Sequence, residues 1–214
     1  MLATILAAPS FGADLPRKAP RYSEPAGFSW SGFYVGLNGG YGWGTSSWTS
    51  AATTGDTKPK GWLAGGTLGY NLQTGVWVWG LEGDLDVSTI KGATTGGTGV
   101  CAGPVGCETR NRWLGTARGR IGYSFDRWLP FLTGGAAFGD VKMSPNTGVN
   151  ETKTKIGWAL GGGVEYAFSG PWSAKIEYLY VDLGKSSCSA ASCGISTDVG
   201  FTSNLVRAGV NYRF

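Results

Sequence analysis

The C-terminal ten residues alternate apolar and polar side chains up to a terminal phenylalanine, Phe214. One face of this run carries Val206, Ala208, Val210, Tyr212 and Phe214, and the other carries Leu205, Arg207, Gly209, Asn211 and Arg213. A period of two indicates a β-strand with two unlike faces. A strand that ends with the chain exposes an edge that attracts other strands unless it is paired. We therefore expect this strand to pair with the first one and close an all-β barrel.

Similar alternation occurs in about eight runs along the chain, which predicts an eight-stranded antiparallel up-and-down barrel. The runs cover residues 33–43, 61–72, 76–87, 111–123, 129–141, 154–168, 172–181 and 205–214. The fifth run is apolar on both faces, and we take Leu132, Ala136 and Phe138 as its outward set. This choice sets the phase of the fifth run.

The connections between these runs alternate in length. Short turns with Gly, Asp or Pro follow Leu72, Ser124 and Phe168. The long connections are polar and rich in Gly, Ser and Thr, and they cover residues of about 45–60, 88–110, 142–153 and 182–201. This pattern is typical of transmembrane barrels, which have short periplasmic turns and long extracellular loops.

Aromatic residues gather near both ends of the apolar faces. Near the short turns these are Phe33, Tyr70, Trp77, Tyr123, Trp172, Tyr212 and Phe214, and near the long loops Trp43, Trp62, Trp113, Phe138, Trp158 and Tyr180. A membrane barrel has such girdles at its two interfaces. A soluble barrel is the alternative, but it would turn the apolar face inward and place its aromatics in the middle. We therefore expect a barrel of the cell outer membrane of a Gram-negative bacterium.

The polar faces carry charges that are expected to point into the barrel lumen. The third run is acidic (Glu82, Asp84, Asp86) and the fourth is basic (Arg112, Arg118, Arg120). Further lumen charges are expected at Glu165, Lys175, Glu177 and Arg207. Adjacent strands of opposite sign neutralise each other in a closed interior, where an unpaired charge is costly. The middle of the apolar faces lacks charge, as expected where Arg or Lys would cost about 2–4 kcal/mol.

Composition excludes several kinds of function. The 214 residues include no histidine, so neither a Ser–His or Cys–His nucleophile nor a His-based metal site can form. A net charge of +4 is too small to indicate a nucleic-acid partner. No stretch of about 18 apolar residues forms a transmembrane helix, although barrel strands need none. We therefore expect no catalysis, no metal and no cofactor.

Residues 1–12 resemble the end of a secretory signal peptide, with an apolar run before Ser10-Phe11-Gly12. A disordered N-terminus is the alternative. Residues 13–30 are rich in proline and charge and predict an extended periplasmic leader, followed by the barrel at 31–214. The basic residues of this leader are Arg17, Lys18 and Arg21.

Four cysteines form two local pairs in Gly/Ser/Ala-rich stretches, Cys101 with Cys107 and Cys188 with Cys193. In an exported protein such pairs predict short disulfide-closed loops. A zinc site is the alternative, but the spacing is not C-x2-C and histidine is absent.

Several motifs resemble one known family. The segments are Ala13–Pro16, Trp30–Gly42, Leu129–Ala137, Lys175–Gly184 and Asn204–Phe214. Together and in this order they resemble the opacity-protein-like "porin family" of outer-membrane proteins of alphaproteobacteria. The resemblance implies an eight-stranded barrel inserted by the barrel-assembly machinery, which recognises a C-terminal aromatic such as Phe214. It also implies a structural or surface-exposed role.

These observations predict a monomeric structural or surface protein that contributes to envelope integrity and displays its loops. A narrow porin for small solutes is one alternative, but eight strands enclose an interior just wide enough for side chains. An adhesin or ligand binder that acts through the loops is the other. The expected partners are outer-membrane lipid, lipopolysaccharide and the barrel-assembly machinery, with peptidoglycan and host surface molecules as further candidates.

Overall fold

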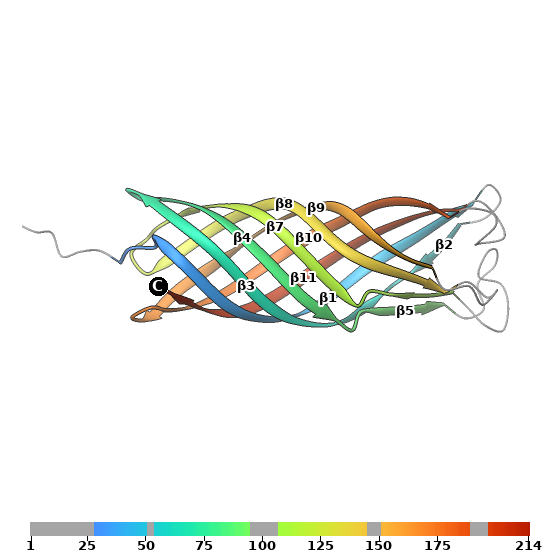
Figure 1. Cartoon of the computed structure of the whole chain (residues 1–214), viewed down its shortest axis with the longest axis horizontal. Coiled ribbons are helices and arrows are strands. Elements are labelled where there is room, and N and C mark those ends of the chain that lie inside the picture. The colour runs from blue at the N-terminus through green and yellow to red at the C-terminus, as the bar shows by residue number, and fades with distance from the viewer. Residues whose placement is uncertain (1–27, 51–53, 95–106, 145–150, 189–196) are drawn as a thin grey trace, which may run out of the picture.

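The computed structural model describes residues 28–50, 54–94, 107–144, 151–188 and 197–214, which form one closed antiparallel sheet (Figure 1). The strands are β1 (Gly32–Ser50), β2 (Thr54–Thr57), β3 (Lys60–Thr74), β4 (Trp77–Ser88), β5 (Lys91–Thr94), β6 (Cys107–Arg110), β7 (Trp113–Tyr123), β8 (Trp128–Ser144), β9 (Glu151–Ser169), β10 (Trp172–Cys188) and β11 (Thr197–Arg213). Within these residues, no helix is long and apolar enough to cross a lipid bilayer.

The N-terminal strand β1 closes the barrel, because it pairs with β3 on one side and with the C-terminal β11 on the other. The β1–β11 ladder runs from Tyr34 opposite Arg213 to Ser50 opposite Thr197. The pairs β3–β4, β4–β7, β7–β8, β8–β9, β9–β10 and β10–β11 complete the circle. Among the described residues, eight long strands therefore form the wall, and the predicted eight-stranded antiparallel barrel is confirmed.

The short turns lie at one end of the barrel, together with the C-terminus (Figure 1). The β3–β4, β7–β8 and β9–β10 turns each contain a residue with positive φ: Gly75 at 64°, Asp126 at 53° and Gly170 at 48°. Glycine adopts this conformation at little cost, and Asp tolerates it better than most side chains. These turns are the short connections that the sequence predicted.

Several strands continue into stretches predicted to be loops. β1 extends to Ser50, β10 to Cys188 and β11 back to Thr197, while β2, β5 and β6 are short strands within the predicted loops. Beyond the apolar band the two faces of a strand no longer differ clearly in polarity, so the period-two signal weakens. The backbone ladder nevertheless continues from strand to strand, and the predicted loop boundaries were therefore too wide.

The two faces of the wall have opposite character. Leu37, Leu81 and Ile156 point outward with exposed fractions between 71% and 75%, whereas Leu179 and Leu205 point inward and are 0% exposed. The ambiguous strand β8 has the predicted phase, because Leu132 is 66% exposed while Leu129 and Phe131 are buried. Leu132 is opposite Ile121 of β7, which the sequence also predicted to point outward.

Aromatic rings form cross-strand pairs at both ends of the apolar exterior, as the predicted girdles require. At the turn end the pairs are Phe33–Tyr70, Trp77–Tyr123, Trp128–Tyr166 and Trp172–Tyr212, with ring centroids between 4.4 and 5.4 Å apart. At the loop end the pairs are Tyr41–Trp62 at 5.2 Å and Trp158–Tyr180 at 5.4 Å. Pairs at these spacings stabilise the ladder beyond their buried area.

Replacing Phe214 by serine is expected to reduce the amount of folded protein in the outer membrane while synthesis is unchanged. Phe214 packs against Tyr212 at 5.2 Å, and its backbone N–H donates to the Phe33 carbonyl at 2.9 Å, so it lies at the β1–β11 seam. The measurement is heat-modifiable electrophoretic mobility of membrane fractions. Phe125→Ser, on the exposed β7–β8 turn, is the matched control. Equal recovery of both variants would contradict a special role for the terminal residue.

Candidate functional site

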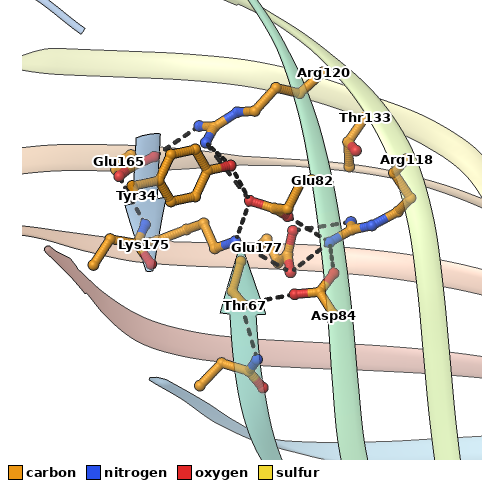
Figure 2. A network of polar contacts seen from close by, with 12 residues as sticks. Tyr34, Thr67, Glu82, Asp84, Arg118, Arg120, Thr133, Glu165, Lys175 and Glu177 are labelled. Atoms are coloured by element: carbon orange, nitrogen blue, oxygen red, sulfur yellow. Dashed lines mark hydrogen bonds and ion pairs between the residues drawn. The ribbon is translucent and has the colours of Figure 1, made fainter. Parts of the chain in front are cut away.

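The barrel interior contains a cluster of charged side chains from β4, β7, β9, β10 and β11, and Figure 2 shows members on β4, β7, β9 and β10. Each of these side chains is at most 4% exposed. We call the cluster the lumen network; it consists of Glu82, Asp84, Asp86, Arg118, Arg120, Glu165, Lys175, Glu177 and Arg207. The structure thus brings together all the predicted lumen charges except Arg112.

Arg118 on β7 links one wall of the barrel to the opposite wall. Its Nη2 lies 2.6 Å from Glu82 Oε1 and 2.5 Å from Asp84 Oδ2, both on the neighbouring strand β4. Its Nη1 donates to Glu177 Oε2 on β10 at 3.2 Å. Its Nε donates to Thr116 Oγ1 at 3.0 Å. The pairing with β4 follows the strand order, whereas the bond to β10 crosses the lumen.

Arg207 on β11 makes a second link across the lumen to β4. Its Nη1 donates to Asp86 Oδ2 at 2.7 Å, and its Nη2 lies 3.3 Å from Asp84 Oδ2. The same guanidinium pairs with Glu177 on the adjacent strand β10, with Nε donating to Oε1 at 2.8 Å. Asp84 and Glu177 are therefore shared by both arginines. A guanidinium group is planar and donates several hydrogen bonds at once, which suits it to such a buried site.

Glu82 also connects the network to the turn end of the barrel. Its Oε2 accepts hydrogen bonds from Lys175 Nζ at 2.8 Å and from the Tyr34 hydroxyl at 2.7 Å. The Tyr34 ring crosses the inner face of β3 at Gly69, where an added Cβ would come within 2.3 Å of its Cζ. Glycine at this position therefore leaves the space that the ring occupies.

Arg120 forms a more separate pair with Glu165. Its Nη2 lies 2.7 Å from Glu165 Oε2, and its Nη1 donates to the Tyr34 hydroxyl at 3.3 Å. The remaining Glu165 oxygen accepts from Ser173 at 2.6 Å and from Asn211 at 2.8 Å. The carboxylate is thus bonded on both oxygens, which a buried charge needs to offset its desolvation.

The prediction that Arg112 is a lumen charge is wrong. Arg112 is exposed and lies just before β7, which begins at Trp113. Its backbone N–H donates to Asp140 Oδ1 at 3.1 Å, and the same carboxylate oxygen accepts from the Trp113 N–H at 3.2 Å. The chain leaves the ladder here, so the inward phase of β7 does not extend back to residue 112.

Apolar side chains fill the lumen on the loop side of the network. The buried cluster consists of Leu63, Ile90, Leu114, Ala137, Ala159, Leu179, Val181, Leu183 and Leu205. Several of these residues continue the inward-facing rows of the charged residues. Leu179 lies two residues after Glu177 on β10, and Leu205 lies two residues before Arg207 on β11. The polar layer is therefore covered by an apolar layer toward the loops.

The segment before β1 fills the opposite, turn-side mouth. Trp30 is 1% exposed and packs with Val78, Leu129 and Ala167, with Phe28 against the same cluster. Its backbone N–H donates to Gln73 Oε1 at 2.7 Å, and its Nε1 donates to the Asp126 carbonyl at 3.2 Å. We call Phe28 and Trp30 the mouth plug.

The mouth plug was not predicted from the sequence, because residues 13–30 were expected to form an extended leader. The available signal was the occurrence of two aromatic residues, Phe28 and Trp30, directly before the barrel in a segment otherwise rich in proline and charge. The Arg213 guanidinium lies 4.2 Å from the Phe28 ring centroid and 5.5 Å from that of Trp30. Such cation–π contacts add to the apolar packing.

The lumen network is built to neutralise charge. Each of its carboxylates lies against an arginine or a lysine, and within the described residues no group of three or more Cys, Asp or Glu is arranged to hold a metal ion. The predicted disulfides stay predictions, because Cys101 and Cys193 lie outside the described residues and the side chains of Cys107 and Cys188 are not described.

Comparisons with known proteins agree with this architecture. Residues 7–214 match the family model of the outer membrane protein β-barrel domain. The chain is 35% identical to the 31 kDa outer-membrane immunogenic protein of Brucella melitensis, over 100% of this chain and 97% of the relative. It is 35% identical to the 22 kDa outer membrane protein of Rhizobium leguminosarum, over 89% and 81% respectively. Neisserial surface protein A has a similar fold, with a TM-score of 0.51 and 17% identity over 86% of this chain and 98% of the other.

The pair of Arg120 and Glu165 offers a direct test of the buried network. Arg120→Met alone is expected to lower the free energy of unfolding by about 3–5 kcal/mol, because it leaves a buried carboxylate without its cation. The double variant with Glu165→Gln should lose less, since Ser173 and Asn211 can still bond the amide. The measurement is urea unfolding in lipid vesicles. A double variant less stable than the single one would contradict this interpretation.

Proposed function

The chain belongs to the outer membrane protein β-barrel family and lies in the cell outer membrane, and from this premise we propose that it is a structural surface protein with a filled lumen. In this role it anchors its loops at the cell surface and contributes to envelope integrity, without catalysis. The observation that carries the proposal is the continuous packing of the interior described above.

Three successive layers support this function. The mouth plug covers the turn end, the lumen network occupies the middle, and the apolar cluster covers the loop side. Eight strands leave an interior that side chains can fill completely. The network side chains are 0–4% exposed, and their charged groups bond to one another and to neighbouring polar side chains.

The porin alternative requires a water-filled path, which this packing disfavours. The relatives support surface display, since the Brucella protein is named an outer-membrane immunogenic protein. The absence of histidine and the engagement of the lumen carboxylates by cations support a role without catalysis. The adhesin alternative concerns loop residues at 51–53, 95–106, 145–150 and 189–196, outside the described part of the chain.

Deletion of the gene separates the structural role from the porin role because the two predict changes of opposite sign. We expect deletion to raise envelope permeability to detergent and to a large fluorescent dye, since a structural component is lost. Loss of a porin would instead slow the uptake of small hydrophilic solutes. Wild-type protein should restore the barrier, whereas Phe214→Ser should restore it poorly. Slower solute uptake with an intact detergent barrier would contradict the proposal.

A further inference from the structure

The lumen network contains one more carboxylate than cations. Within the described residues its positive groups are Arg118, Arg120, Lys175 and Arg207, and its negative groups are Glu82, Asp84, Asp86, Glu165 and Glu177. All of these side chains are buried, and a net charge in such an interior is costly because its surroundings screen it weakly. The network is therefore one positive charge short of balance.

The other charged side chains that are buried in the described part of the chain do not restore this balance. They are Lys155 on β9 and Asp140 on β8, which have opposite signs. Both lie farther toward the loops, past Ala159 and Ala137 of the apolar cluster. The half-buried Arg213 lies at the opposite mouth, where its guanidinium stacks on the rings of the mouth plug. The excess negative charge therefore belongs to the network itself.

One carboxylate oxygen of the network lacks a hydrogen-bond donor. Both oxygens accept hydrogen bonds from described side chains in four of the carboxylates, Glu82, Asp84, Glu165 and Glu177. Asp86 differs, because its Oδ2 accepts from Arg207 Nη1 at 2.7 Å, whereas its buried Oδ1 has no donor among the described residues. The missing positive charge and the missing donor thus point to the same carboxyl group.

Asp86 lies at the loop-side edge of the network, next to the apolar cluster. It is opposite Leu114 of that cluster on β7 and opposite Gly65 on β3. Its Oδ1 occupies the space that a side chain at Gly65 would fill. Asn38 of β1 is opposite Gly65 in the other ladder, and its buried Oδ1 also lacks a donor among the described residues. Two acceptor oxygens on the strands either side of Gly65 therefore lack a hydrogen.

We propose that Asp86 holds a proton on Oδ1 at neutral pH and is the pH-sensitive member of the lumen network. The proton supplies the missing positive charge, and it turns Oδ1 from an acceptor into a donor. Asn38 Oδ1, across Gly65, is an acceptor in need of such a donor. A buried carboxyl group without a partner takes up a proton more readily than it stays charged. A metal cation fits less well, because it needs several oxygen ligands and Asp86 borders an apolar layer.

The side chains around Asp86 come from several strands. The charged members in this part of the network are Asp84 on β4, Arg118 on β7, Glu177 on β10 and Arg207 on β11. From β1 and β3 come the uncharged Asn38 and Thr67, whose side chains bond to each other at 3.1 Å. Arg207 is shared among three carboxylates, so it does not neutralise Asp86 alone. Loss of the proton would leave one uncompensated negative charge between β4 and β11.

The test compares two variants with the same chemical change, Asp86→Asn and Glu165→Gln, in the refolded full chain in lipid vesicles. Infrared spectroscopy of the wild type at neutral pH should show the C=O stretch of a protonated carboxyl group, which lies apart from the carboxylate bands. This band is expected to vanish in Asp86→Asn and to persist in Glu165→Gln. Its absence from the wild type, or its persistence in Asp86→Asn, would overturn the proposal.

Urea unfolding of the same samples gives a second readout, with heat-modifiable mobility as the check that each variant folds. At neutral pH the unfolding midpoint of Asp86→Asn should be no lower than that of the wild type, because the amide keeps the network neutral. The midpoint of Glu165→Gln should be lower, because Arg120 loses its counter-charge. Equal destabilisation of the two variants would count against the proton on Asp86.

The pH dependence of unfolding has a defined sign. Aspartates of the unfolded chain are ionised at neutral pH, so the folded state binds one proton more and stability should fall as the pH rises. The wild type is therefore expected to lose stability from neutral to alkaline pH relative to Asp86→Asn. Stabilisation of the wild type by sodium over choline salts, absent in Asp86→Asn, would overturn the proposal in favour of a bound cation. None of these readouts depends on the envelope phenotype, so they stand apart from the proposed function.

Discussion

The structure depends on the requirement that charges inside a narrow barrel neutralise one another. Eight strands leave no room for a hydration shell around Arg118 or Arg207, so each guanidinium must find carboxylates within the wall. Ion pairs buried in this way largely repay the cost of removing their charges from water, and they add little net stability. Their consequence is specificity, because Asp84 and Glu177 meet both arginines only when β4, β7, β10 and β11 are in register.

The two faces of the wall carry different kinds of side chain. In the lumen, cations and carboxylates are paired and then covered by the mouth plug and the apolar cluster. On the outside, apolar side chains face the membrane, and exposed tryptophans such as Trp43 and Trp62 mark its loop-side interface. A filled interior favours a protein that acts through its surface.

Period-two alternation made the fold and much of the network predictable. The pairing of Glu82 with Arg118 follows from an acidic strand next to a basic one. The bonds from Arg207 to Asp86 and from Arg118 to Glu177 could not be predicted, because they join strands that are not neighbours and depend on barrel closure. Arg112 was misplaced because alternation does not show where a strand begins. Trp30 was missed because a plug has no periodic signal.

Single-channel conductance in a planar lipid bilayer tests the filled lumen most directly. The folded wild type and Trp30→Ala should be compared, with an established porin as the positive control. The account predicts no conductance steps from either protein, because the lumen network and the apolar cluster remain when the mouth plug is weakened. Reproducible openings of the folded wild type would contradict the central claim that side chains close this barrel.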